Sequence, residues 1–134
     1  MKTLLVLEDE LIVMVLLRHV LKQYRLIEAA TAEQALRLFN EHGRRIDLLL
    51  ADVTLPTISG IQVALLLRME MPNLPVILTS GYPVAAWAMS DADDLQRLGS
   101  TLVAVIQKPF QAGVIPSTIR EMIGTEPFEA VRTA

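Results

Sequence analysis

The chain is predicted to adopt an α/β fold in which helices cover both faces of a parallel sheet. Short apolar runs alternate five times with longer segments of helical periodicity. Strands that are separated by helical crossovers pair in parallel, and the helices pack on the two faces of the sheet. The apolar runs are nearly continuous, which is typical of strands buried on both faces. The 134 residues are enough for one such domain.

The five strands are expected at the apolar runs, at residues 3–7, 25–29, 46–51, 76–79 and 102–106. The first helix is expected at residues 10–24, because its polar side chains recur on one side. Thr31 and Gln34 form a capping box that begins the second helix, and Gly43 is placed to end it. The third helix is expected at residues 61–69 and the fourth at about 84–98, while the fifth ends near residue 123.

The composition narrows the class of protein. Hydrophobic residues make up 52% of the chain, but the longest apolar run, residues 11–17, is far below the ~20 residues that a membrane span requires. Glu8, Asp9 and Glu10 interrupt the N-terminal apolar run before it could form a signal peptide. The absence of cysteine excludes disulfides and thiolate metal sites, so a cytoplasmic location is expected. A net charge of −3 disfavours direct binding of nucleic acid.

Polar side chains follow four of the predicted strands at their carboxyl ends. Glu8 and Asp9 follow the first strand, Asp52 the third, Ser80 the fourth and Lys108 the fifth. In sheets of this kind, ligands bind beyond the carboxyl ends of the strands, where the strand order reverses. We therefore expect these side chains to converge at one edge of the sheet.

The charges of this group predict a metal site. Two like charges ~4 Å apart repel by roughly 4 kcal/mol at an effective dielectric constant of about 20, so three adjacent carboxylates require compensating cations or protonation. Lys108 supplies one positive charge, and Mg²⁺, which prefers oxygen ligands, would supply the rest. A metal in this position assists phosphoryl transfer. Asp52 would be the nucleophile, while Ser80 and Lys108 would contact the phosphoryl oxygens.

Four motifs, each at a strand end and in this order, resemble those of the receiver domains of bacterial response regulators, the CheY-like superfamily. They are Leu7-Glu8-Asp9-Glu10, Ala51-Asp52-Val53-Thr54-Leu55-Pro56 with Gly60, Pro75-Val76-Ile77-Leu78-Thr79-Ser80-Gly81, and Gln107-Lys108-Pro109-Phe110. The resemblance covers about residues 1–123, which are expected to form the receiver domain. Residues 124–134 are expected to be a C-terminal tail, with no output domain. The resemblance implies a flavodoxin-like (βα)5 fold, doubly wound, with a five-stranded parallel sheet in the order 2-1-3-4-5.

The resemblance also implies a role for each acidic residue. Asp52 is expected to accept the phosphoryl group and to bind Mg²⁺. Asp9 is expected to bind the metal directly, and Glu8 through a water molecule. The main-chain carbonyl of Thr54 is expected to complete the metal site.

Two further residues match the family's phosphate-contacting groups. Ser80, five residues after Pro75, matches the switch hydroxyl, and Lys108 matches the lysine that pairs with phosphate. The implied donor is a phosphohistidine of a sensor histidine kinase or phosphotransfer protein. Phosphorylation would then change the interaction with a downstream protein or promote a homodimer. Such a domain is not an enzyme, apart from catalysing its own phosphorylation and dephosphorylation.

Three departures from the family's pattern cluster around its output surface. Val105 stands where family members usually carry Tyr or Phe, three residues before the lysine, as a rotamer switch. The interval from Ser80 to Lys108 is several residues longer than usual, and the extra length falls around the fourth helix. Gly113 and Pro116 lie where the fifth helix usually begins. Proline is tolerated only in the first turn, so a late start is expected for that helix.

Two other functions remain as alternatives. A phosphorylation-independent interaction scaffold would keep the fold without the usual switch, and Val105 and the altered fourth helix make this alternative possible. A small phosphatase with an aspartyl nucleophile is disfavoured, because Thr54 stands where an acid/base residue two positions beyond Asp52 would be needed. Trp87, the only tryptophan, is expected to belong to the core in preference to an interface.

Overall fold

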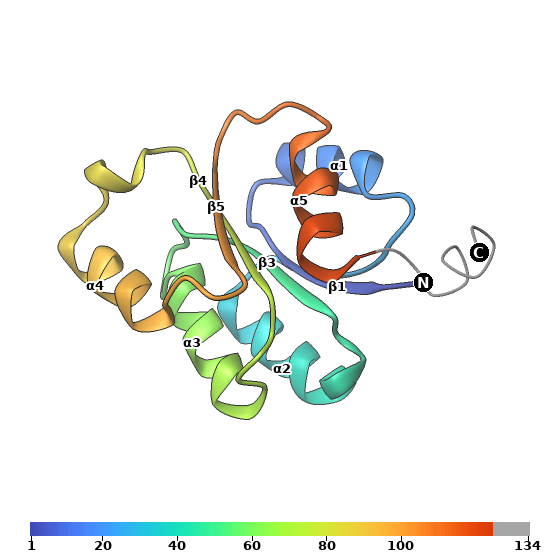
Figure 1. Cartoon of the computed structure of the whole chain (residues 1–134), viewed down its shortest axis with the longest axis horizontal. Coiled ribbons are helices and arrows are strands. Elements are labelled where there is room, and N and C mark those ends of the chain that lie inside the picture. The colour runs from blue at the N-terminus through green and yellow to red at the C-terminus, as the bar shows by residue number, and fades with distance from the viewer. Residues whose placement is uncertain (125–134) are drawn as a thin grey trace.

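The structure is a computed structural model that describes residues 1–124, and it contains one sheet with helices on both faces (Figure 1). Its strands are β1 (Thr3–Leu7), β2 (Arg25–Ala29), β3 (Leu48–Asp52), β4 (Val76–Ser80) and β5 (Val103–Gln107). They pair in the order β2-β1-β3-β4-β5, and every pair is parallel. The predicted flavodoxin-like fold and its strand order are therefore confirmed.

Helices follow the strands along the chain and cover both faces of the sheet. The α-helices are α1 (Leu11–Val20), α2 (Ala32–His42), α3 (Gly60–Glu70), α4 (Met89–Leu98) and α5 (Val114–Ile123), and two short 3₁₀ helices are η1 (Gly43–Arg45) and η2 (Val84–Ala86). α1 and α5 cover one face, while α2, α3 and α4 cover the other (Figure 1). As predicted, the Thr31 hydroxyl caps α2 by accepting a hydrogen bond from the Gln34 N–H at 3.1 Å. Gly43 ends this helix with φ of 52°, a conformation that favours glycine.

The central strand, β3, contributes side chains to the hydrophobic core on both faces of the sheet. Leu49 and Ala51 belong to the cluster on the side of α2 and α3, whereas Leu48 and Leu50 belong to the cluster beneath α1 and α5. None of the four is more than 1% exposed. The alternation follows from the two-residue period of a strand, and burial on both sides explains the unbroken apolar run. This rigid strand ends at Asp52 and so fixes the position of that carboxylate.

Two predicted helices are wrong in extent. The first stops short of residue 24, because residues 21–24 turn the chain into β2, where the Arg25 N–H bonds the Lys2 carbonyl. The fourth does not begin at residue 84. Instead η2 closes with a hydrogen bond from the Trp87 N–H to the Val84 carbonyl, and Trp87 itself is extended, with ψ of 153°. α4 begins two residues further on, so the apolar residues before it do not continue the helix.

The structure also bears on the predictions about the start of the fifth helix, a membrane span and the C-terminal tail. Pro116 is the third residue of α5, in the first turn, where its missing N–H removes no intrahelical hydrogen bond, and Gly113 is the N-cap. Within residues 1–124, no helix is both long and apolar enough to cross a membrane. The predicted C-terminal tail lies outside the described residues, apart from Gly124.

The Arg68 side chain connects α3 to the two segments that precede β4 and β5. The guanidinium of Arg68, on α3, donates hydrogen bonds of 2.9–3.1 Å to the carbonyls of Leu74, Leu98, Thr101 and Leu102. Hydrogen bonds from a charged donor contribute about 1.5–3 kcal/mol each, and buried carbonyls left without a donor are costly. We expect Arg68→Ala to lower the free energy of unfolding by about 3 kcal/mol, measured by urea denaturation.

A matched control for this substitution is Arg37→Ala on α2. The Arg37 side chain is 65% exposed, and its ion pair with Glu41 is 4.0 Å long. An exposed pair of this kind contributes little, so the change in the free energy of unfolding should stay within about 0.5 kcal/mol. Equal effects of the two substitutions would show that the carbonyl contacts of Arg68 do not stabilise the fold.

Candidate functional site

An acidic cluster lies at the carboxyl edge of the sheet, beyond β1 and β3. Glu8, Asp9, Glu10 and Asp52 each offer a carboxylate oxygen, and these oxygens lie within 4.8 Å of one another. β1 and β3 are neighbouring parallel strands, so the residues that follow them meet at the same edge. The structure therefore brings together the three carboxylates that the sequence singled out.

Glu10 is a member of this cluster to which the sequence analysis assigned no role. Its side chain is 64% exposed, and its Oε1 lies 3.7 Å from the Nζ of Lys108. Glu10 directly precedes α1 but makes no side-chain hydrogen bond to cap the helix. The sequence does place Glu10 directly after Glu8 and Asp9, which could have indicated that it belongs to the acidic cluster. However, acidic residues are common before a helix, because they interact favourably with its N-terminus.

Lys108, after β5, compensates part of this negative charge. Its Nζ donates hydrogen bonds to Glu8 Oε1 at 2.9 Å and to Asp52 Oδ2 at 3.1 Å. The side chains of Lys108, Glu8 and Asp52 are only 14%, 2% and 4% exposed. Burial acts to lower the pKa of Lys108, but the hydrogen bonds and charges of the two carboxylates outweigh it, so the pKa is raised. Lys108 is therefore a buried cation held by two carboxylates.

The pKa of the buried Glu8 carboxyl stays raised despite its hydrogen bond from Lys108. Burial raises the pKa of Glu8, and the charge of Asp52 adds to that rise. The hydrogen bond from Lys108 and a 3.1 Å bond from the Glu10 main-chain N–H oppose it without cancelling it. A further cation beside Glu8 would favour its ionised form.

Asp52 lines an open hollow at this edge of the sheet. Its Oδ1 accepts a hydrogen bond from the Thr54 main-chain N–H at 3.1 Å, and its Oδ2 accepts one from Lys108. The hollow has a volume of about 450 Å³, and its lining residues are Asp9, Glu10, Asp52, Thr54, Gly81, Tyr82 and Lys108. The carboxylate is thus oriented by two donors while the space beside it remains accessible.

Ser80 lies at the end of β4, next to the main chain of Lys108, whose N–H bonds the Ser80 carbonyl at 2.7 Å. Ser80 is 1% exposed. Its hydroxyl oxygen accepts hydrogen bonds from the Tyr82 main-chain N–H at 3.0 Å and from the Trp87 indole N–H at 3.1 Å. The structure therefore places Ser80 beside the site with its hydroxyl held by two donors.

Trp87 precedes α4 in the chain, and Val105 lies on β5. Trp87 is half-buried and packs against the core cluster on the α3 side, which agrees in part with its expected place in the core. Val105 is 37% exposed and lines a groove of about 390 Å³ with residues of α4, among them Leu95. An aromatic ring is therefore absent from the position where the family's pattern places its switch.

The residues at this edge fit a hard divalent cation. The clustered groups are carboxylates, the oxygen ligands that Mg²⁺ prefers, and the chain has no cysteine to offer a softer ligand. The cluster carries four acidic side chains against one buried lysine, so a cation reduces its net charge. The assignment of Asp9, Asp52, Glu8 and the Thr54 carbonyl to a metal stays a prediction.

The strand order, together with an acidic cluster and a lysine at the carboxyl edge of the sheet, is the arrangement of a receiver domain of two-component signalling. The family model described as the response regulator receiver domain matches residues 4–120. The chain belongs to this family.

Curated relatives differ in how much of their length the chain covers. DivK of Brucella anthropi, a polar-differentiation response regulator, is 32% identical over 127 residues, which are 92% of this chain and 97% of DivK. The sensor kinase CckA of Brucella abortus is 29% identical over 100 residues, 75% of this chain but 10% of the kinase. The response regulator GtcR of Aneurinibacillus migulanus is 34% identical over 81% of this chain and 42% of its own length. The chain therefore spans less than half of CckA and of GtcR.

Solved structures share the fold. A CheY-like receiver domain protein from Methanospirillum hungatei aligns with a TM-score of 0.77 and 22% identity, covering 92% of this chain and 94% of that one. The receiver domain of the hybrid histidine kinase CckA aligns with a TM-score of 0.72 and 28% identity, covering 90% of this chain and 98% of that domain.

Proposed function

We propose that the protein accepts a phosphoryl group on Asp52 with the help of Mg²⁺ and thereby switches its interactions in two-component signalling. The observation that supports this most directly is the position of the Asp52 carboxylate. It is fixed by Lys108 and the Thr54 N–H, and it lies beside an open hollow within an acidic cluster. The family supports the same role in general terms.

In the proposed reaction an oxygen of the Asp52 carboxylate forms a bond to phosphorus as the phosphorus–nitrogen bond of a phosphohistidine breaks. The imidazole leaves with the electron pair of that bond, and Asp52 becomes an acyl phosphate. Glu8, Asp9, Asp52 and the Thr54 carbonyl would hold Mg²⁺, which when bound neutralises charge on the phosphoryl oxygens. The ammonium of Lys108, now 3.1 Å from Asp52, is placed to pair with a phosphoryl oxygen.

Intact-mass spectrometry with a small phosphodonor tests this proposal. The protein is incubated with Mg²⁺ and acetyl phosphate, and we expect a mass increase of one phosphoryl group that maps to Asp52. Asp52→Asn and a sample with EDTA should both remain unmodified. The absence of Mg²⁺-dependent modification would favour the interaction scaffold, for which the exposed Val105 is the supporting observation.

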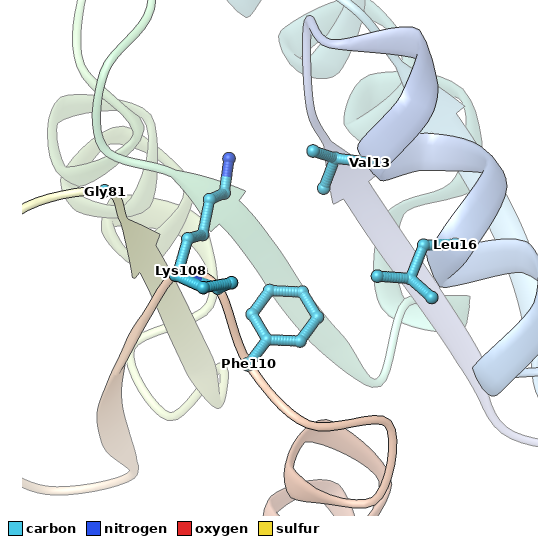
Figure 2. A pocket seen from close by; sticks show the side chains of 6 residues that line it. Val13, Leu16, Gly81, Lys108 and Phe110 are labelled. Carbon is cyan, nitrogen blue, oxygen red and sulfur yellow. The ribbon is translucent and has the colours of Figure 1, made fainter.

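We propose that a sensor histidine kinase or a phosphotransfer protein donates the phosphoryl group by docking on α1. Four apolar side chains of α1 are exposed to solvent: Leu11 (70%), Ile12 (84%), Val15 (51%) and Leu16 (40%). Such a contiguous apolar surface is typical of a protein interface. Beside it lies an apolar groove of about 400 Å³, across which Val13 and Leu16 face Lys108 and Phe110 (Figure 2). Lys108 lines both this groove and the hollow at Asp52, so a partner on α1 lies next to the acceptor.

We expect Ile12→Asp to slow phosphoryl transfer from a protein donor about tenfold or more, because a charge replaces an apolar contact at the centre of the interface. Phosphorylation by acetyl phosphate should be unchanged, since the acceptor site is intact. Met69→Asp, on α3, is the control, because Met69 is 78% exposed on the other face of the sheet. Equal rates for all three proteins with the protein donor would exclude docking on α1.

A further inference from the structure

The only tryptophan of the chain, Trp87, makes a contact that the proposed phosphoryl transfer does not use. Its single indole N–H is shared between Ser80 Oγ and the Tyr82 carbonyl oxygen, each 3.1 Å from Nε1. The ring also packs against the core cluster on the α3 side of the sheet. Trp87 lies between η2 and α4, in a segment whose other residues are exposed. The indole therefore attaches this segment to the end of β4.

The hydrogen bonds leave the Ser80 hydroxyl no spare acceptor capacity. A hydroxyl has one donor hydrogen and two acceptor lone pairs. Both lone pairs are used, by the Tyr82 N–H at 3.0 Å and by the Trp87 indole. Where the side chain rotates to another staggered position to bring its hydroxyl to a phosphoryl group on Asp52, Oγ moves away from the Trp87 indole. The bond from Trp87 therefore opposes that rotation.

We infer that Trp87 holds the Ser80 hydroxyl in the unphosphorylated protein and loses it when a phosphoryl group on Asp52 takes that hydroxyl. The inference rests on the proposed function, because it requires a phosphoryl group on Asp52. A hydrogen bond from the hydroxyl to a charged phosphoryl oxygen is stronger than the neutral bond that the hydroxyl accepts from the indole, which favours this rotation. The indole N–H then has only the Tyr82 carbonyl, and the segment from η2 to α4 loses its attachment to Ser80.

Trp87 thus supplies an aromatic sensor in a chain that lacks one on β5. Val105 has neither a ring nor a polar atom with which to respond to Ser80. Trp87 has both, and its indole is already bonded to the hydroxyl. The signal accordingly passes along the main chain to η2 and α4, which directly flank Trp87.

Intrinsic fluorescence reports this contact directly, because all tryptophan emission comes from one indole. Mg²⁺ and beryllofluoride are added to the full chain, and ¹⁹F NMR of the same sample detects fluoride bound at Asp52. We expect a red shift of the emission maximum when the bound-fluoride signal appears. In Ser80→Ala the emission should not shift even where the bound-fluoride signal appears, and Asp52→Asn should show neither the signal nor the shift.

Trp87→Phe separates this role from simple packing. Phenylalanine keeps an aromatic ring but lacks the N–H that opposes the rotation of Ser80. We expect beryllofluoride to bind this variant about fivefold more tightly, the equivalent of one ordinary hydrogen bond. Equal or weaker binding would overturn the inference.

Two outcomes separate the inference from the proposed function. In the wild-type protein, bound fluoride with unchanged tryptophan emission would overturn the inference and leave phosphoryl acceptance on Asp52 intact. No bound fluoride at Asp52 would overturn the proposed function, and the inference with it.

Discussion

Replacing Lys108 by methionine is expected to lower the free energy of unfolding of the metal-free protein by about 3–5 kcal/mol. The substitution removes the cation from two carboxylates whose side chains are only 2% and 4% exposed, those of Glu8 and Asp52. A buried ion pair contributes little net stability, but removing one partner leaves an uncompensated buried charge. Urea denaturation in EDTA at neutral pH measures the loss. Lys22→Met, at an exposed position just after α1, is the control and should have little effect.

Mg²⁺ should restore part of the stability of the Lys108→Met variant, because a divalent cation compensates the same carboxylates. By linkage, a ligand that binds only the folded state stabilises it according to its concentration relative to its Kd. The stability gained on adding Mg²⁺ should therefore be larger in the variant than in the wild type. If the variant is as stable as the wild type in EDTA and gains nothing from Mg²⁺, the cluster needs no compensating cation.

The pH dependence of the variant has a definite sign. Burial already raises the pKa of Glu8, and the lysine that opposes this rise is gone. Where the folded carboxyl binds more protons than the unfolded one, stability falls as pH rises. The loss should therefore be small below the ordinary glutamate pKa of 4.5 and should grow as the pH rises through the raised pKa of folded Glu8. In the wild type, the contribution of Lys108 to the free energy of unfolding is fully present below pH 10.5, the ordinary pKa of lysine. It is lost as the pH rises through the raised pKa of folded Lys108.

The architecture and the acidic edge could be predicted because both follow from local patterns. Burial of β3 on both faces requires an unbroken apolar run, and such a run is visible in the sequence. Parallel strands then bring their carboxyl ends to one edge, so Asp9, Asp52 and Lys108 could be placed there without coordinates. The family match over residues 4–120 agrees with this reasoning.

What could not be predicted depends on individual side-chain contacts or on apolar side chains that the described fold leaves exposed. At the break between η2 and α4, Trp87 donates a hydrogen bond to Ser80, seven residues earlier in the chain. Helical periodicity does not predict this hydrogen bond. The polar residues of α1 were expected to mark its solvent side, but Ile12 and Val15 are exposed as well. The periodicity of the polar residues alone therefore did not show which apolar side chains of α1 are exposed.

Gly60→Ala is expected to destabilise the protein and to slow phosphorylation of Asp52, because the added methyl group would clash with the end of β3. A Cβ at position 60 would lie 2.2 Å from the Asp52 carbonyl oxygen, 2.9 Å from its carbonyl carbon and 3.0 Å from the Ala51 Cβ. Two of these atoms belong to the main chain of β3, which cannot yield as a flexible side chain can. Since Gly60 begins α3, either the helix or the end of β3 must move. We expect a loss of about 3 kcal/mol in the free energy of unfolding.

The same contact links the packing of α3 to the proposed role of Asp52 as phosphoryl acceptor. The Asp52 carboxylate is held by hydrogen bonds of 3.1 Å from Lys108 and from the Thr54 N–H, and both depend on where β3 ends. A displacement near 1 Å at a reacting group can slow a reaction about 100-fold, so labelling by acetyl phosphate should fall by a similar factor at temperatures where the variant is folded.

Gly113→Ala is the control for the general effect of adding a methyl group to a glycine. A Cβ at position 113 meets no atom within 4 Å, so both stability and labelling should stay close to wild type. If Gly60→Ala labels as fast as the wild type, the end of β3 tolerates movement without loss of function. The close approach of α3 to Asp52 would then serve packing alone. Slow labelling of a folded Gly60→Ala protein would instead show that the first residue of α3 sets the position of the acceptor.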